Sequence, residues 1–133
     1  MIDVSDLIGK PWSWGARGPD AYDCFGLLIE VSRRYGIDWK PNDMLRDVPY
    51  SLDGMKAAID ALLPGSNWVE VDTARPGDAV MCGASRLLYH VCPVVDGGVL
   101  HTSRTATGII LTRAENLSFF GYRQQQAYRW LAS

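Results

Sequence analysis

The sequence predicts an α+β domain in which N-terminal helices pack on a C-terminal antiparallel β-sheet. The chain has 133 residues, of which 47% are hydrophobic and 21% are charged, and this size and composition suit one folded domain over residues 1–133. Apolar residues repeat at helical spacing in the first half, and the second half reads as short strands between turn residues. The pair Asp96-Gly97 between two apolar runs is typical of a tight hairpin, which joins antiparallel strands.

Helical spacing predicts three helices: a short one at residues 4–8, a longer one at about residues 23–35, and a third at roughly residues 52–63. Asp23 can cap the start of the long helix, and Gly36 suits its end. Short apolar runs predict strands at residues 68–71, 79–82, 90–95, 99–102 and 108–111, with further strands at 119–123 and 128–131. A turn is expected at Arg75-Pro76-Gly77-Asp78.

Charge and hydropathy argue against several classes of partner. The net charge is −2, whereas a protein that tracks phosphates usually has a basic excess, so no nucleic-acid partner is expected. No apolar run approaches the roughly 20 residues that cross a bilayer, so no membrane insertion is expected. The first residues lack a basic segment followed by an apolar one, so we expect synthesis in the cytoplasm without a signal peptide. Three cysteines are too few for a disulfide scaffold.

Cys24 lies in the first turn of the predicted long helix. Unpaired amides and the helix dipole favour an anion there, so we expect a lowered thiol pKa and a nucleophilic sulfur. The alternative is that Cys24 is a small buried hydrophobic residue.

The two histidines of the chain, His90 and His101, both lie on the predicted hairpin. A two-residue loop at Asp96-Gly97 pairs residues so that His90, Cys92, His101 and Ser103 share one face, with the histidines as diagonal neighbours. Two imidazoles on a face packed against a helix that starts with a thiol form the layout of a cysteine hydrolase. Alternatively, each histidine is structural, or Cys82, His90, Cys92 and His101 bind zinc, although their spacing matches no usual zinc motif.

Three blocks of the sequence, in order, resemble the NlpC-type cell-wall peptidases, a compact relative of papain. These are Gly9-Lys10-Pro11-Trp12-Ser13-Trp14-Gly15 with Tyr22-Asp23-Cys24-Phe25-Gly26-Leu27-Leu28, then Arg75-Pro76-Gly77-Asp78-Ala79-Val80, and then Tyr89-His90-Val91 through His101. The resemblance spans about residues 7–103 and implies a compact papain-like fold without a cofactor or a metal.

The resemblance also implies an activity. Family members cleave peptide bonds in the stem peptides of bacterial peptidoglycan, commonly between D-glutamate and diaminopimelate or lysine. By position, Cys24 would be the nucleophile, His90 the base and His101 the residue that orients His90, with the backbone N–H of Cys24 stabilising the oxyanion. The chain departs from the family pattern at Trp12, where a Tyr is frequent, and at Phe25 and Cys92.

Candidate substrate contacts are Trp12, Trp14, Tyr22 and Asp23. For the aromatic residues, packing of the loop against the first long helix is an equal alternative, and for Asp23 helix capping is preferred over contact with a substrate amine. Arg17 is expected on the solvated surface.

The loop motif looks most like versions encoded with phage tails and gene-transfer particles. This likeness implies location in the tail of a phage-like particle, tail or baseplate proteins as partners, and action in the bacterial cell wall. The alternative function is a catalytically idle adaptor subunit of a phage tail tip, with Trp12, Trp14 and Tyr22 as a protein-binding surface.

Overall fold

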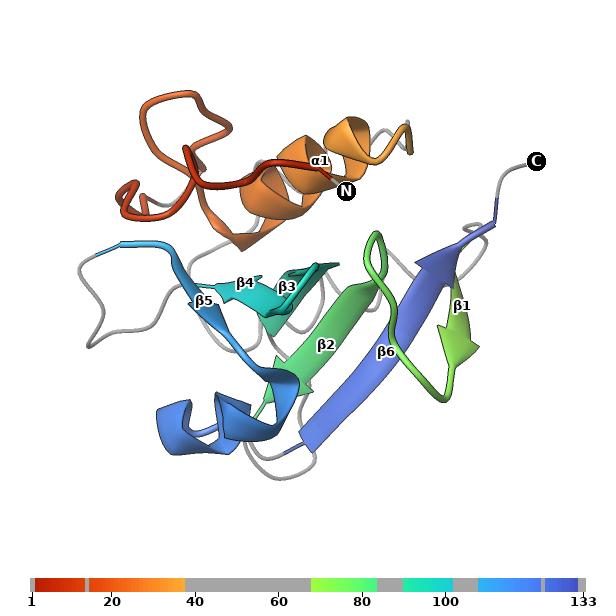
Figure 1. The fold of residues 1–133 in the computed structure, drawn as a ribbon. Coiled ribbons are helices and arrows are strands. Elements are labelled where there is room, and N and C mark those ends of the chain that lie inside the picture. The colour runs from red at the N-terminus through yellow and green to blue at the C-terminus, as the bar shows by residue number, and fades with distance from the viewer. Residues whose placement is uncertain are drawn as a thin grey trace.

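The computed structural model describes residues 2–13, 15–37, 68–83, 90–101, 108–122 and 124–131. One α-helix, α1 (Cys24–Arg34), precedes the strands in this part of the chain (Figure 1). The later elements are β1 (Trp68–Val71), β2 (Ala79–Gly83), β3 (His90–Val95), β4 (Gly98–His101), β5 (Ile110–Thr112), the 3-10 helix η2 (Ala114–Phe120) and β6 (Gln124–Trp130). The predicted α+β class is therefore confirmed. The helix expected at residues 52–63 and the side chain of Trp14 lie outside the described residues.

The strands form an antiparallel sheet in the order β1-β6-β2-β3-β4-β5. Val95 pairs with Gly98, so the hairpin loop is Asp96-Gly97, as the sequence predicts. β3 and β4 pair at Val94–Val99 and Val95–Gly98, and β4 then continues along β5. The ends of β3 and β4 that carry His90 and His101 therefore diverge from each other.

The long helix α1 is confirmed, and local chemistry explains its bounds. The Asp23 side chain caps its start by accepting from the backbone N–H of Gly26, and Arg33 and Arg34 lie in its last turn, where positive charge suits the helix dipole. Gly36 follows with φ +77°, which favours glycine. The helix therefore begins directly at Cys24.

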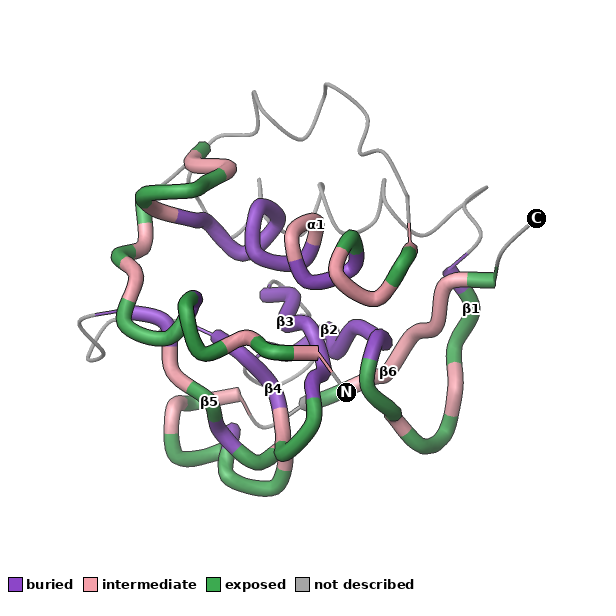
Figure 2. The backbone as a smooth tube through the Cα atoms, turned by 45° about the horizontal axis from the view of Figure 1, so that its top comes forward, coloured by how far each residue is buried: buried purple, intermediate pink, exposed green. Residues whose placement is uncertain are grey.

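One face of the sheet packs against α1. Phe25 and Leu28 contact Met81 and Val91 in one cluster, and a neighbouring cluster joins Leu27 and Val31 of α1 to Val95 and Leu100. Figure 2 shows the buried side of α1 over the buried central strands. α1 thereby holds Cys24 against the start of β3.

The other face of the sheet is covered by η2, which lies on the side away from α1 in Figure 1. Leu117 of η2 is fully buried there, together with Val80, Cys82, Cys92, Val94 and Val99. The central strands β2 and β3 are thus buried on both faces.

Two predicted elements are wrong. Residues 5–9 form a turn instead of a short helix. The strand expected at residues 119–123 is occupied by the end of η2 and by Gly121, which has φ +88°. The apolar pair Phe119-Phe120 suggests a strand, but Leu117 anchors a 3-10 turn on the sheet. The last strand begins earlier than expected, at Gln124.

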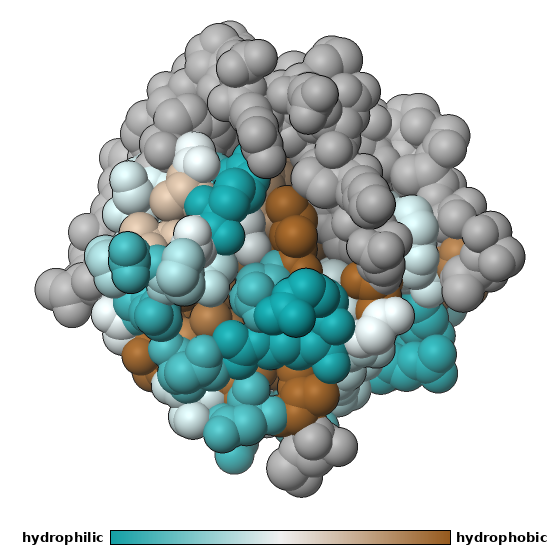
Figure 3. Space-filling view, turned by 90° about the horizontal axis from the view of Figure 1, so that it is seen from above, coloured by the Kyte–Doolittle hydropathy of each residue, from teal (hydrophilic) through white to brown (hydrophobic). Residues whose placement is uncertain are grey.

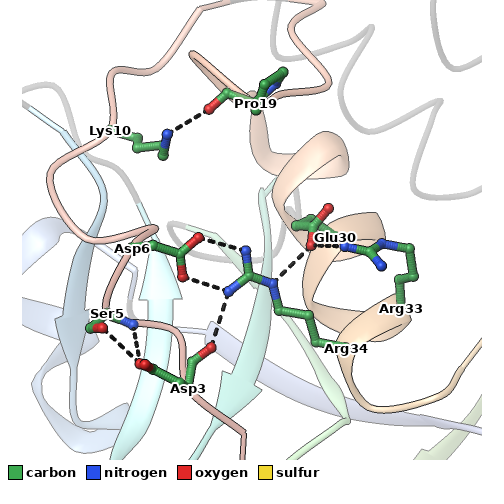
Figure 4. A network of polar contacts seen from close by, with 8 residues as sticks. All are labelled: Asp3, Ser5, Asp6, Lys10, Pro19, Glu30, Arg33 and Arg34. Carbon is green, nitrogen blue, oxygen red and sulfur yellow. Dashed lines mark hydrogen bonds and ion pairs between the residues drawn. The ribbon is translucent and has the colours of Figure 1, made fainter.

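The N-terminal segment is tied to the far end of α1 by charge. Arg34 donates to both carboxylate oxygens of Asp6, at 2.6 and 2.7 Å, and to Glu30, while Arg33 also contacts Glu30 (Figure 4). Hydrophilic side chains gather on this side of the molecule in Figure 3. In the described ranges, no helix has the length and apolar character needed to cross a membrane.

The predicted turn at Arg75–Asp78 is held by a buried carboxylate. Asp78 accepts from the backbone N–H of Arg75 at 2.9 Å and from Nε and Nη2 of Arg129 at 2.9 Å each. Arg129 lies on β6, so this pair ties the turn before β2 to the neighbouring strand. Asp78 therefore has a structural role, in keeping with its predicted place in the turn.

Candidate active site

Cys24 occupies the junction between the start of α1 and the start of β3. Its thiol is buried, with 4% of the residue exposed, and it packs with Phe25 of α1 and Val91 of β3 in one core cluster. Val91 directly follows His90 in β3. The fold thus brings the cysteine of the helix to the strand that carries the first histidine, although the two residues are 66 positions apart in the sequence.

The expectation of a lowered thiol pKa is wrong for this conformation. Burial raises the pKa of Cys24 well above its usual value, and the negative charge of the neighbouring Asp23 acts in the same direction. The amides of Val91 and Phe25 favour the thiolate but do not outweigh burial. Position at a helix start was visible in the sequence, whereas the loss of water around the sulfur follows from the tertiary structure.

His90 and His101 share one face of the sheet, as predicted. Cys82 pairs with His90 and Val80 with Cys92, so these four side chains face the same way. The Val94–Val99 pair places His101, two residues after Val99, on this face as well. Ser103, expected beside them, lies outside the described residues.

The histidine face is covered by the segment around η2 and not by α1, contrary to the prediction. Tyr122 stacks on His90, with ring centroids 4.9 Å apart and an interplanar angle of 19°, and lies edge-on to His101 at 6.3 Å. The ring of Phe120 lies edge-on to His101, with ring centroids 4.9 Å apart. The physical reason is strand alternation: Val91 faces α1, so His90 and Cys92 face the opposite side.

The two imidazoles have different surroundings. His101 Nε2 lies 2.8 Å from Thr112 Oγ1, and Thr112 belongs to β5. His90 is 7% exposed, and its buried Nε2 has no hydrogen-bond partner within the described part of the chain. Burial, followed by the effect of His101, lowers the pKa of His90 to about 3, so this imidazole is neutral at neutral pH.

The structure therefore brings together some of the predicted site residues, but not the Cys24 sulfur and a histidine ring. Cys24 packs against Val91, the residue that follows His90, and the two histidines lie on one face. Among the described side chains, no hydrogen bond joins the Cys24 sulfur to either imidazole. Sequence reasoning missed Thr112, Phe120 and Tyr122 as contacts of the histidines, because they come from distant segments without a motif.

The candidate substrate residues occupy different environments. Tyr22 is 3% exposed and packs in the core with Leu27 and Val31, which is the packing role that the sequence left open. Trp12 is half-buried and forms a backbone bridge with Tyr22. Asp23 is 2% exposed and caps α1. Arg17, expected on the solvated surface, is instead paired with Asp23, with Nη1 2.6 Å from Oδ1.

The other two cysteines lie on the histidine face. The sulfur atoms of Cys82 and Cys92 are 3.8 Å apart, and both residues are fully buried and unoxidised. Across the described ranges, no three His, Cys, Asp or Glu side chains are placed to hold one metal ion. A cavity of about 430 Å³ opens beside the β3–β4 turn, next to Asp96 and Arg113, at the opposite end of β3 from His90.

Comparison with known proteins agrees with this fold. No family model matches the sequence. A curated relative, the probable endopeptidase p60 of Listeria grayi, is 32% identical over 91 residues, which cover 68% of this chain and 15% of the relative. The chain thus spans a small part of the length of that protein.

Two solved structures share the fold. NlpC1 from Trichomonas vaginalis has a TM-score of 0.58 and 20% sequence identity, over 94% of this chain and 40% of that protein. NlpC2 from the same organism has a TM-score of 0.58 and 19% identity, over 95% of this chain and 43% of that protein. The chain therefore has the fold of these two NlpC proteins, and part of its sequence is similar to the probable endopeptidase p60.

Proposed function

We propose that this chain is a cysteine peptidase that hydrolyses amide bonds in peptidoglycan stem peptides. The observation that supports the proposal is the packing of Cys24, at the start of α1, against Val91, which follows the base candidate His90 in β3. The similarity to a probable endopeptidase supports hydrolysis of peptides by this site.

The proposed chemistry starts from a neutral pair. Burial keeps the Cys24 thiol protonated and the His90 imidazole neutral, so His90 can accept the thiol proton when its ring reaches the sulfur. The thiolate attacks the amide carbonyl, and the backbone N–H of Cys24 stabilises the oxyanion. The imidazolium then protonates the leaving amine, and water hydrolyses the thioester. His101 orients His90, with its own ring held by Thr112.

Release of peptide fragments from purified peptidoglycan and from a defined muropeptide tests the proposal. We expect wild-type protein to release stem-peptide fragments, and Cys24→Ala and His90→Ala to lose this activity while retaining the fold. His101→Ala should lose less, because orientation contributes less than the nucleophile. Cys92→Ala removes another buried thiol and is the matched control, expected to retain activity. Cleavage by Cys24→Ala at the wild-type rate would contradict the proposal.

The burial of the thiol favours a second candidate, an idle site in an adaptor subunit of a phage-like tail. Carriage on such a tail, with tail or baseplate proteins as partners, rests on the likeness of the Trp12–Cys24 region to phage versions. Activity of the isolated protein excludes an idle site, and stable complex formation with a tail protein from the same genome supports carriage. The two outcomes are independent, so an active tail-borne enzyme gives both.

A further inference from the structure

The carboxylate that precedes Cys24 is buried and fully engaged. The Asp23 side chain is 1% exposed. Its Oδ1 accepts from the backbone N–H of Gly26 at 2.7 Å and from Arg17 Nη1 at 2.6 Å, and its Oδ2 accepts from the backbone N–H of Gly15 at 3.1 Å. A substrate ammonium would have to displace Arg17 to reach this carboxylate. Asp23 is therefore committed to the protein's own structure.

The backbone around Arg17 lies directly on the first turn of α1. The N–H of Asp23 donates to the carbonyl of Ala16 at 3.0 Å. A Cβ atom at Gly26 would lie 2.4 Å from that carbonyl oxygen and 3.1 Å from Cα of Arg17. Contacts thus flank Cys24 on both sides, at Asp23 and at Gly26. The loop that carries Arg17 and the first turn of the helix that carries Cys24 therefore form one closely packed unit.

Charge gives this unit an electrostatic role. An uncompensated carboxylate next to Cys24 opposes formation of the thiolate, since like charges repel strongly where water is excluded. The guanidinium of Arg17, with a side chain that is 20% exposed, supplies the opposite charge at 2.6 Å. Among the described residues, Cys82 on β2 and Cys92 on β3 are further titratable groups that interact with Cys24. Burial raises the pKa of the Cys92 thiol and keeps it neutral at neutral pH, whereas Asp23 and Arg17 carry opposite charges beside the first turn of α1.

We propose that Arg17 is a positioning residue for Cys24: it offsets the charge of buried Asp23 and ties the loop to the first turn of α1. This inference rests on the proposed function, because it concerns how the nucleophile is prepared. Arg17 acts through Asp23 and does not touch the reacting atoms in this role.

The rate at which iodoacetamide alkylates Cys24, measured against pH by mass spectrometry of the Cys24 peptide, tests the inference. The four variants of the full chain are R17Q, R17K, D23N and the double variant R17Q/D23N. Gln keeps a donor but removes the charge of Arg17, and Asn keeps the capping oxygen but removes the charge of Asp23. R34Q removes an arginine that pairs with two carboxylates at the other end of α1 and is the matched control.

We expect R17Q to raise the apparent pKa of Cys24 by about one unit, which lowers the alkylation rate at a fixed pH below the midpoint about tenfold. D23N should move the pKa in the opposite direction, the double variant should lie near the wild type, and R17K should largely rescue R17Q. R34Q should titrate as the wild type.

Two results would overturn the inference: R17Q with the wild-type pH profile, or D23N and R17Q shifting in the same direction, which would show loosening of the loop alone. If R17Q does not fold, D23N still gives the sign of the shift, because it removes the charge that Arg17 offsets. Alkylation does not require peptide cleavage. If R17Q shifts the pH profile of alkylation but the wild type has no peptidase activity, the result counts against the proposed function alone. If the wild type is active but R17Q shows no shift, the result counts against the role of Arg17 alone.

Discussion

His90 and Tyr122 stack face to face, with ring centroids 4.9 Å apart and an interplanar angle of 19°. The stack holds the imidazole on the face of the sheet that η2 covers, whereas Cys24 packs on the α1 face, and burial lowers the pKa of His90 to about 3. Activation of the proposed nucleophile therefore requires the His90 ring to leave Tyr122.

Removal of the Tyr122 ring should restore an ordinary titration to His90. In Tyr122→Ala, water reaches the imidazole, so its pKa should rise from about 3 toward 6.5. Proton NMR of the imidazole Cε1–H against pH measures this. Tyr122→Phe keeps the stacked ring and is the control, expected to match the wild type. An unchanged His90 titration in Tyr122→Ala would show that other groups bury the ring.

The buried neutral His90 should make the protein less stable in acid. Its pKa is lowered in the folded state, so the unfolded chain binds one more proton between pH 6.5 and about 3. The free energy of unfolding should therefore fall as pH drops through this window, by up to about 1.4 kcal/mol per pH unit, with no such loss above it. Urea unfolding at a series of pH values measures the slope. His90→Gln should flatten it, and equal slopes in both proteins would contradict the assignment.

A side chain at Gly26 should push the loop off α1. The Cβ atom of Gly26→Ala would meet the Ala16 carbonyl at 2.4 Å, so we expect a loss of about 1–3 kcal/mol in the free energy of unfolding. The alkylation rate of Cys24 should change as well. Gly36→Ala is the control: it meets nothing within 4 Å, and its φ of +77° costs about 1–2 kcal/mol without disturbing the thiol. Equal alkylation rates of Cys24 in the two variants would show that packing of the loop on α1 does not affect the thiol.

Loss of the Asp78 carboxylate should destabilise the fold more than loss of an exposed one. Asp78→Ala leaves the N–H of Arg75 and the guanidinium of Arg129 without their acceptor, and the Asp78 side chain is 3% exposed. Asp6→Ala breaks a comparable two-point contact with Arg34, but the Asp6 side chain is 58% exposed. Thermal unfolding should show a drop of several degrees for Asp78→Ala and a smaller one for Asp6→Ala. The reverse order would show that the turn contributes little.

Local patterns in the sequence determined the long helix and the central hairpin. A capping Asp23 followed by an apolar repeat specified α1, and Asp96-Gly97 between two apolar runs specified the β3–β4 hairpin and its register. Strand alternation then placed His90 and His101 on one face, because side-chain direction in a strand has a period of two. Leu117 shows where local pattern fails: its burial on the sheet converts an apolar segment into η2.

Tertiary structure alone decided which face of the sheet meets which partner, and so decided the charge state of the candidate site. Val91 faces α1, which leaves His90 under Tyr122, and no local signal fixes that choice. The same packing excludes water from Cys24 and joins Arg17 to Asp23. Ionisation depends on the solvent and the charges within a few ångströms in space, and segments distant in the chain supply both.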